Sequence, residues 1–246
     1  MTAPETLYEV IEATWPPAST QPCGPFTLRN GADGGKRVSA ATARTPARAQ
    51  ERAAVQNAQD AMRAMDQAPL FMIRQGDEAL DKVLADAGYT IIDPVNIYAG
   101  PTSLLTATRP PRTSTFNLWP PLQIQRDIWA AGGIGPARID IMERSVCPKT
   151  ALFGRDDNRP AGTGYAAIHQ GIAMVHAVEV LPRHRRRGLG RYMMHAAALW
   201  AETHGAATLA VTCTHANTAA NALYPALGMT LAARYHYRHL TQEHAT

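Results

Sequence analysis

Hydrophobic and polar positions along the chain follow two different periods, and these separate the expected strands from the expected helices. Residues 172–180, Ile-Ala-Met-Val-His-Ala-Val-Glu-Val, are apolar on both faces, which is typical of a buried strand that ends before Pro182. After Gly188 the period lengthens, because apolar residues from Leu189 to Trp200 recur on one face of a helix. The other expected strands are residues 138–144, 149–155, 164–170, 208–213 and 229–239. The other expected helices are residues 122–131 and 217–227, and Asn217 is suited to cap the second at its N-terminus.

The first half of the chain repeats the order of helices and strands more faintly. Its expected elements are helices at residues 47–65 and 77–87 and strands at residues 70–74 and 89–98. Residues 36–43, ahead of the first long helix, have no pair of glycines where a phosphate could approach the backbone. We interpret this half as a degenerate repeat without its own cofactor, with a coincidental α/β order as the alternative.

Prolines mark the boundary between the two halves. Residues 101–122 contain five prolines among Thr and Ser, and proline interrupts both helices and central strands. This segment therefore predicts a linker between two domains. Residues 1–115, including the linker, would form the first domain, and residues 116–246 the second.

The composition narrows the class of protein. The 246 residues are 46% hydrophobic and 18% charged, which is typical of a globular protein, and no apolar run approaches the roughly 20 residues of a transmembrane helix. We expect no membrane association. The N-terminal residues have no basic segment followed by an apolar one, so we expect a cytoplasmic protein. Cys23, Cys147 and Cys213 are too widely spaced for a zinc site and are interpreted as reduced thiols.

The positive charge is concentrated in one segment. The net charge is +4, and five of the 24 Lys and Arg residues lie between Arg183 and Arg191. Aromatic residues do not interleave with these arginines, so the phosphates of a cofactor explain them better than nucleic acid does. Nucleic-acid binding and a merely solvated basic turn remain the alternatives.

The same segment has the glycine pattern of an anion site. Gly188 and Gly190 allow backbone N–H groups to approach a pyrophosphate at the start of a helix, where the helix dipole also favours an anion. Together with Arg185, these glycines resemble the acetyl-CoA-binding signature Arg/Gln-x-x-Gly-x-Gly/Ala of the GNAT superfamily of N-acetyltransferases. A second resemblance lies downstream, where Asn217 and Tyr224 stand in the spacing of the pattern Asn-x-x-Ala-x-x-Leu-Tyr-x-x-Leu-Gly-Phe.

The resemblance covers residues 116–246 and implies a fold and a donor. The fold would be α/β, with a mixed, mostly antiparallel GNAT sheet flanked by helices and a second, smaller degenerate GNAT-like domain. The donor would be acetyl-CoA, with the backbone of Val178 and Val180 pairing with its pantetheine arm and Asn217 contacting it from the opposite side. The residues that would hold its pyrophosphate are Arg185, Arg186, Arg187, Gly188, Leu189, Gly190 and Arg191.

Acyl transfer to an amine requires an acid for the departing sulfur and a base for the amine. The resemblance implies that Tyr224 is the acid, although an isolated tyrosine of this kind would more often lie at the edge of a core. Some family members carry a glutamate as base where this chain has Thr212. Glu179 is the best substitute. The equally open alternative is an exposed glutamate or one that forms an ion pair, for example with an arginine of the basic loop, residues 183–191. We interpret His176 as a core-edge residue rather than a base.

These observations predict an N-acetyltransferase that moves acetyl from acetyl-CoA to a primary amine by direct attack. A catalytically silent acyl-CoA sensor is the alternative. The sequence does not identify the acceptor, which could be a small molecule, an amino acid or a peptide. Family members often dimerise, so a homodimer is a further expectation, and no metal site is expected.

Overall fold

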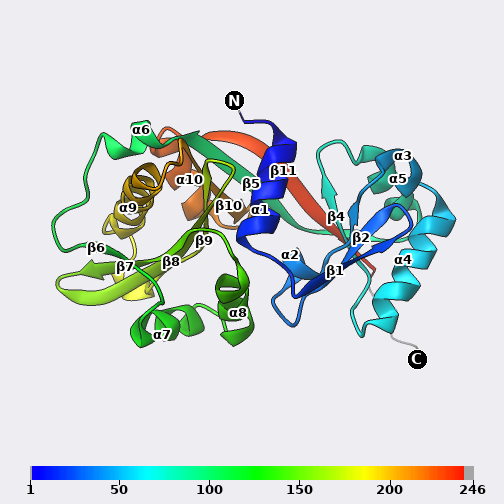
Figure 1. Ribbon diagram of the computed structural model, residues 1–246, viewed down its shortest axis with the longest axis horizontal. Coiled ribbons are helices and arrows are strands. Elements are labelled where there is room, and N and C mark those ends of the chain that lie inside the picture. Colours follow the sequence, from blue (N-terminus) through cyan, green and yellow to red (C-terminus); the bar gives the residue numbers. More distant parts are fainter. Residues whose placement is uncertain (1, 241–246) are drawn as a thin grey trace. The chain divides into compact units, whose positions relative to one another are not determined.

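The computed structural model describes residues 2–240, and its residues form two compact units (Figure 1). Unit 1 comprises the described residues up to Pro16 together with Asn96–Cys213 and Asn217–Ala232. Unit 2 comprises Pro17–Val95, Thr214–Ala216 and the described residues from Ala233 onward. Neither unit is a continuous half of the chain. The division into domains at residue 115 stays a prediction.

Unit 1 is built on a mixed sheet. Its strands lie in the order β11-β5-β10-β9-β8-β7-β6. Their bounds are β5 (Thr90–Pro101), β6 (Thr115–Leu118), β7 (Lys149–Asp156), β8 (Arg159–His169), β9 (Ile172–Val180), β10 (Thr208–Thr214) and β11 (Thr230–His239). Strands β6 to β9 pair antiparallel in succession, and β9 and β10 pair parallel. Of β5 and β11, the parts from Asn96 and up to Ala232 belong to this unit.

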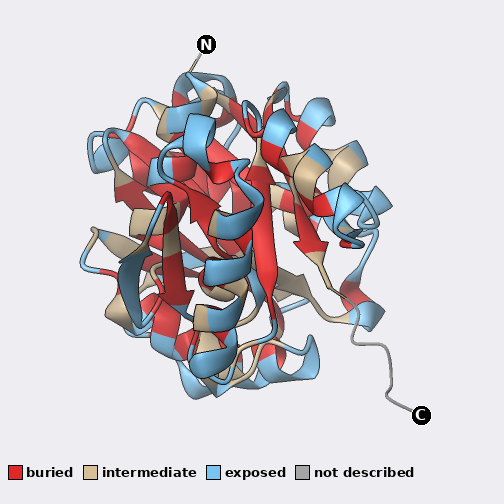
Figure 2. Ribbon diagram, turned by 90° about the vertical axis from the view of Figure 1, so that its right-hand side faces the viewer, coloured by how far each residue is buried: buried red, intermediate tan, exposed pale blue. Residues whose placement is uncertain are grey.

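Helices cover both faces of this sheet. They are α1 (Pro4–Thr14), α6 (Thr102–Thr106), α7 (Gln123–Ala131), α8 (Pro136–Arg144), α9 (Leu189–Thr203) and α10 (Thr218–Ala226). Any Cβ at Gly162 or Gly164 would crowd Met193 of α9, so the missing side chains let α9 approach β8. The alternate residue Thr163 accepts a hydrogen bond from Gln125 of α7, which therefore lies on the opposite face. Burial follows these layers, with buried strands inside helices whose outer faces are exposed (Figure 2).

Unit 2 repeats part of this architecture. Its elements are β1 (Ser19–Cys23), β2 (Phe26–Asn30), α2 (Lys36–Ser39), β3 (Thr42–Ala43), α3 (Pro46–Ala49), α4 (Arg52–Ala64), β4 (Leu70–Arg74) and α5 (Glu78–Asp86). Strands β1, β2 and β3 form an antiparallel sheet, and β4 pairs antiparallel with the end of β11. A parallel bridge joins Ala41 to Phe71, so the chain ahead of β3 runs beside β4 as β9 runs beside β10.

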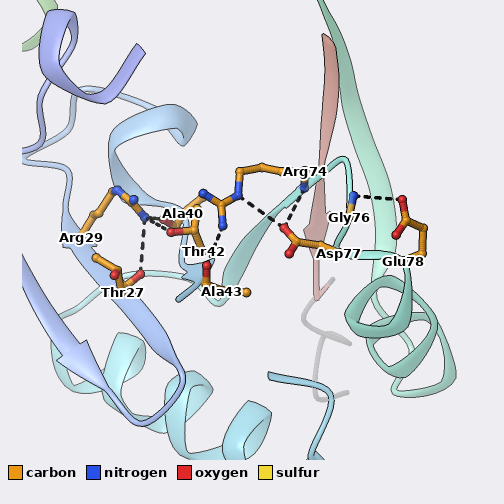
Figure 3. A network of polar contacts seen from close by, with 9 residues as sticks. All are labelled: Thr27, Arg29, Ala40, Thr42, Ala43, Arg74, Gly76, Asp77 and Glu78. Atoms are coloured by element: carbon orange, nitrogen blue, oxygen red, sulfur yellow. Dashed lines mark hydrogen bonds and ion pairs between the residues drawn. The ribbon is translucent and has the colours of Figure 1, made fainter. Parts of the chain in front are cut away.

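A buried polar network ties these elements of unit 2 together (Figure 3). Arg29 is 5% exposed and donates to the carbonyl oxygen of Ala40 and to Oγ1 of Thr42. Arg74 donates to the carbonyl oxygen of Ala43 at 2.6 Å and to Asp77 at 3.4 Å. Guanidinium groups thus satisfy the carbonyl oxygen of Ala40, ahead of β3, and that of Ala43, at the end of β3.

The structure corrects three expectations for single elements. Residues 138–144 were expected to form a strand, because Ile139 and Ile141 alternate with polar residues. They lie in helix α8 instead, where the buried Ile139 and Met142 have the helical spacing of three positions. The helix expected at residues 47–65 is two helices, α3 and α4, interrupted at Gln50 and Glu51. The proline-rich segment 101–122 lies wholly in unit 1 and includes α6 and β6, so it does not connect the two units.

The remaining expected strands and helices are confirmed to within a few residues at each end. In the part of the chain that the structure describes, no helix combines the length and hydropathy needed to cross a bilayer.

Candidate functional site

Strands β9 and β10 separate at the centre of the unit 1 sheet. Their parallel register runs from Ile172 opposite Thr208 to Val175 opposite Val211, and it stops there. Two residues later, Ala177 has a φ of 52°, and the register with β8 shifts at the same level. Trp129 of α7 donates its indole N–H to the carbonyl oxygen of Ala177 at 2.7 Å, which holds this bulge in place. The end of β9 therefore stays paired with β8 while it leaves β10.

A cavity of about 780 Å³ lies beside the end of β9, between the basic loop, the start of α9 and helix α10. It lies entirely within unit 1. The residues singled out from the sequence that line it are Val178, Glu179, Val180, Arg185, Arg186, Gly188, Leu189, Gly190, Arg191, Asn217 and Tyr224. Arg187 is outside this lining. Volumes of this size are typical of sites for small organic ligands and cofactors.

The start of α9 offers unpaired backbone donors to this cavity. Gly188 is the N-cap residue with a φ of 86°, a left-handed conformation that glycine adopts without strain. The first intrahelical bond in this turn runs from Tyr192 N–H to the carbonyl oxygen of Gly188, and among the described residues no side chain caps the helix. The N–H groups of Leu189, Gly190 and Arg191 therefore have no partner within the helix, and the helix dipole adds positive potential at the same place.

The arginines of the loop have different partners. Arg185 donates to the carbonyl oxygen of Val180 at 2.8 Å and to Glu179 at 3.0 Å. Arg187 pairs with Asp156 at 2.6 Å and Asp157 at 3.0 Å, in the turn between β7 and β8. Arg186 and Arg191 line the cavity, as Arg185 also does.

Helix α10 supplies the opposite wall. Asn217 is its N-cap, and its Oδ1 accepts a hydrogen bond from Ala220 N–H at 3.1 Å, which confirms the predicted capping role. Tyr224 is 4% exposed, lines the cavity and lies 5.6 Å from Tyr98, measured between ring centroids. Burial raises the pKa of the Tyr224 phenol far above its usual value, and the neighbouring Cys213 and Tyr98 add to the rise. The Tyr224 phenol is therefore protonated at physiological pH.

Glu179 stands at the edge of the cavity, and its side chain is 19% exposed. A Cβ at Gly132 would lie 2.6 Å from the Glu179 carboxyl carbon, so the absence of a side chain at Gly132 makes room for this glutamate. The carboxylate pairs with Arg185, which is the alternative that the sequence left open for it. Thr212 is not among the residues that line the cavity.

His176 is a core-edge residue, as expected. Its ring is 3% exposed, Nε2 lies 2.8 Å from Oγ1 of Thr14, and the ring stacks on Tyr165. It lies outside the cavity lining.

Sequence reasoning missed several residues that shape this site. Trp129 and Gly132 of the α7 region contact β9, and Asp156 contacts the basic loop. Paired acidic residues followed by Asn in a turn between two strands were the available signal for Asp156, but the sequence did not show which loop the turn would meet.

Comparison with known proteins agrees with this geometry. The model of the acetyltransferase (GNAT) family matches residues 118–229. No curated protein matches the chain significantly.

Solved structures share the fold. A GCN5-related N-acetyltransferase from Kribbella flavida is 20% identical with a TM-score of 0.77, over 100% of this chain and 98% of that one. An acetyltransferase of the GNAT family from Colwellia psychrerythraea is 15% identical with a TM-score of 0.54, over 70% and 65% of the two chains.

A tandem GNAT protein from the clavulanic acid biosynthesis pathway is 15% identical with a TM-score of 0.60, over 87% of this chain and 76% of that one. This match extends beyond residues 118–229 and supports the GNAT-like fold predicted for the N-terminal half. The mixed sheet flanked by helices is likewise the predicted architecture. Residues 118–229 of this chain therefore form a domain that matches the acetyltransferase (GNAT) family.

Proposed function

We propose that this protein transfers an acetyl group from acetyl-CoA to a primary amine by direct attack of the amine. One observation carries the proposal: a single cavity brings together the end of β9 that no longer pairs with β10, the open N-terminus of α9 and the buried phenol of Tyr224. These features correspond to the polyamide arm, the diphosphate and the thioester of an acyl-CoA. The acceptor is not identified, and small molecules, amino acids and peptides all remain candidates.

The chain has groups suited to each part of the donor. The N–H groups of Leu189, Gly190 and Arg191 would bind the diphosphate, and the side chains of Arg186 and Arg191 would neutralise its charge. Beyond the last parallel pair with β10, the backbone around Val178 and Val180 would pair with the amides of the pantetheine arm in the manner of an added strand.

The proposed reaction uses two side chains of the cavity. The neutral amine attacks the thioester carbonyl carbon, a new C–N bond forms and the C–S bond breaks. Glu179 would accept the proton that the amine nitrogen loses, directly or through a water molecule, after exchanging its contact with Arg185. Tyr224 would protonate the departing sulfur, because its phenol lines the cavity and carries its proton at neutral pH.

A second candidate function is a silent acyl-CoA sensor. The ion pair between Glu179 and Arg185 favours it, because a carboxylate held by a guanidinium is a poor base. The absence of a carboxylate at Thr212 points the same way.

The two functions are separated by measuring binding and turnover on the same preparation. We expect calorimetric titration to show acetyl-CoA binding, and a panel of primary amines to release free CoA thiol with at least one acceptor class. Binding without thiol release across the panel would favour the sensor. Absence of acetyl-CoA binding would reject both.

A further inference from the structure

Acidic residues at the turn between β7 and β8 form ion pairs with the basic loop. Asp156 Oδ2 lies 2.7 Å from Nδ1 of His184 and 2.6 Å from a terminal guanidinium nitrogen of Arg187. Asp157 adds a contact of 3.0 Å to the same arginine. The His184 and Asp156 side chains are only 7% and 17% exposed, so this is a partly buried anchor rather than a solvated surface pair.

The neighbouring contact fixes how the histidine takes part. Arg183 donates its Nε–H to Nε2 of His184 at 3.1 Å, so Nε2 is an acceptor. The ring proton is then on Nδ1 and points at Asp156. One carboxylate oxygen therefore accepts hydrogen bonds from two residues that flank the loop.

The inner side of the loop is held separately. Arg185 is tied to Val180 and Glu179 at the end of β9, while Arg187 is tied to the β7–β8 turn. Arg186 lies between these two anchors with a φ of 64°, a left-handed conformation that is strained for a residue other than glycine. Such a conformation persists where the surroundings hold it, and here the two flanking arginines are held by different elements.

We propose that Asp156 is a positioning residue for the donor diphosphate. It holds His184 and Arg187, and through them keeps Arg186 and the following N–H groups of α9 in the conformation that receives an anion. This inference rests on the proposed function, because it concerns the same cavity. Without the anchor the loop would have to be ordered when the donor binds, at a cost in affinity and not in the chemical step.

The variant Asp156→Asn tests this role, because loss of the anchor and loss of the charge predict opposite changes in acetyl-CoA affinity. Removing a carboxylate beside an arginine-rich loop would by charge alone strengthen binding of a polyanion. Loss of the anchor predicts the opposite, a Kd for acetyl-CoA that rises roughly tenfold, as expected when one residue must be ordered on binding. Turnover at saturating acetyl-CoA should stay unchanged.

S-acetylpantetheine, which has no diphosphate, provides the internal comparison. Its Kd, measured by the same calorimetric titration, should be equal in the wild type and in Asp156→Asn. Asp140→Asn, which removes an exposed carboxylate on α8, is the matched control and should leave both affinities unchanged. Arg187→Lys keeps the positive charge but removes the guanidinium fork that contacts Asp156 and Asp157, at a residue whose side chain is 48% exposed. It should weaken acetyl-CoA binding in the same way, and it remains informative if Asp156→Asn does not fold.

The outcomes are distinct. Unchanged or tighter acetyl-CoA binding by the folded anchor variants would overturn the positioning role, and so would an equal loss of affinity for S-acetylpantetheine. If the wild type itself does not bind acetyl-CoA, the proposed function fails before the role of Asp156 is reached.

Discussion

At the residue scale, Tyr224 and Glu179 carry most of the proposed chemistry, and their surroundings differ. Tyr224 is buried against Tyr98, and burial keeps its phenol protonated. Glu179 is paired with Arg185 and is therefore ready for catalysis only if that pair opens. The proposed acid, Tyr224, is thus already protonated, whereas the proposed base, Glu179, must first give up its ion pair with Arg185.

Tyr224→Phe should lower turnover with little change in acetyl-CoA affinity. The phenyl ring preserves the packing, and only the proton donor is lost, so a decrease of roughly 10²–10⁴-fold in kcat is expected. The measurement is kcat together with the calorimetric Kd of acetyl-CoA. Tyr98→Phe is the matched control, because its hydroxyl contacts Asn221 and it does not line the cavity. An unchanged kcat in Tyr224→Phe would dismiss the acid role.

At the element scale, local sequence signals set the ends of the helices that build the site. Helix α10 begins at an Asn that accepts a backbone hydrogen bond, and α9 begins after a glycine that leaves the helix end open. The first arrangement stabilises a helix by itself, and the second leaves donors for a ligand. The N-terminus of α10 is therefore capped by a side chain, whereas that of α9 is not.

Asn217→Ala should destabilise the protein by about 1 kcal/mol, because the cap of α10 is lost. Asn217→Asp keeps an acceptor oxygen and should retain most of the stability. Urea unfolding monitored by circular dichroism measures the difference. Equal losses in the two variants would show that the cap contributes nothing and that Asn217 stabilises α10 by other contacts.

In unit 2, α5 is joined to the end of β11 by an ionic cluster. Asp81 accepts hydrogen bonds from Arg238 at 2.7 Å and from His236 at 2.8 Å. Partial burial would raise the pKa of Asp81, but these bonds outweigh it and leave the pKa lowered. The cluster therefore stabilises unit 2 above the unfolded Asp pKa of about 3.9, and the stabilisation is lost as the pH falls through the lower folded value.

Asp81→Asn should accordingly lower stability at neutral pH and reduce its decline on acidification. Thermal unfolding of the wild type and the variant over a series of acidic buffers measures both effects. Asp86→Asn, at an exposed position of the same helix, is the control. Parallel pH profiles for wild type and Asp81→Asn would contradict the assignment.

At the scale of the whole molecule, the units are not consecutive segments. Strand β5 lies between β10 and β11 in the unit 1 sheet, although it comes from before residue 115, and α1 also belongs to unit 1. The family match at residues 118–229 therefore lacks strand β5 and helix α1 of the same unit.

A fragment of residues 116–246 should fail to fold cooperatively, because it lacks the strand between β10 and β11 and exposes both edges. Circular dichroism and thermal melting test this directly. Adding residues 1–115 as a separate chain should restore a cooperative transition. A fragment that melts cooperatively without its partner would show that β5 is dispensable.

The sequence alone was sufficient where short-range chemistry decides the structure. The glycine loop, the Asn cap of α10 and the apolar strand β9 follow from residues close to one another, so their positions were predicted correctly. Helix α8 was mistaken for a strand, because Ile139 and Ile141 alternate with polar residues as in a strand and the segment is too short to show a helical period clearly.

The tertiary structure alone decided which distant residues meet. Three features depend on segments that are far apart in the chain. They are the separation of β9 from β10, the different partners of Arg185 and Arg187, and the insertion of β5 between β10 and β11. Local composition carries no record of such pairings, since a basic side chain has the same sequence signature whether it faces a ligand or an aspartate. The sequence thus determined the residues of the candidate donor site, and the packing of remote strands determined which of them face the cavity.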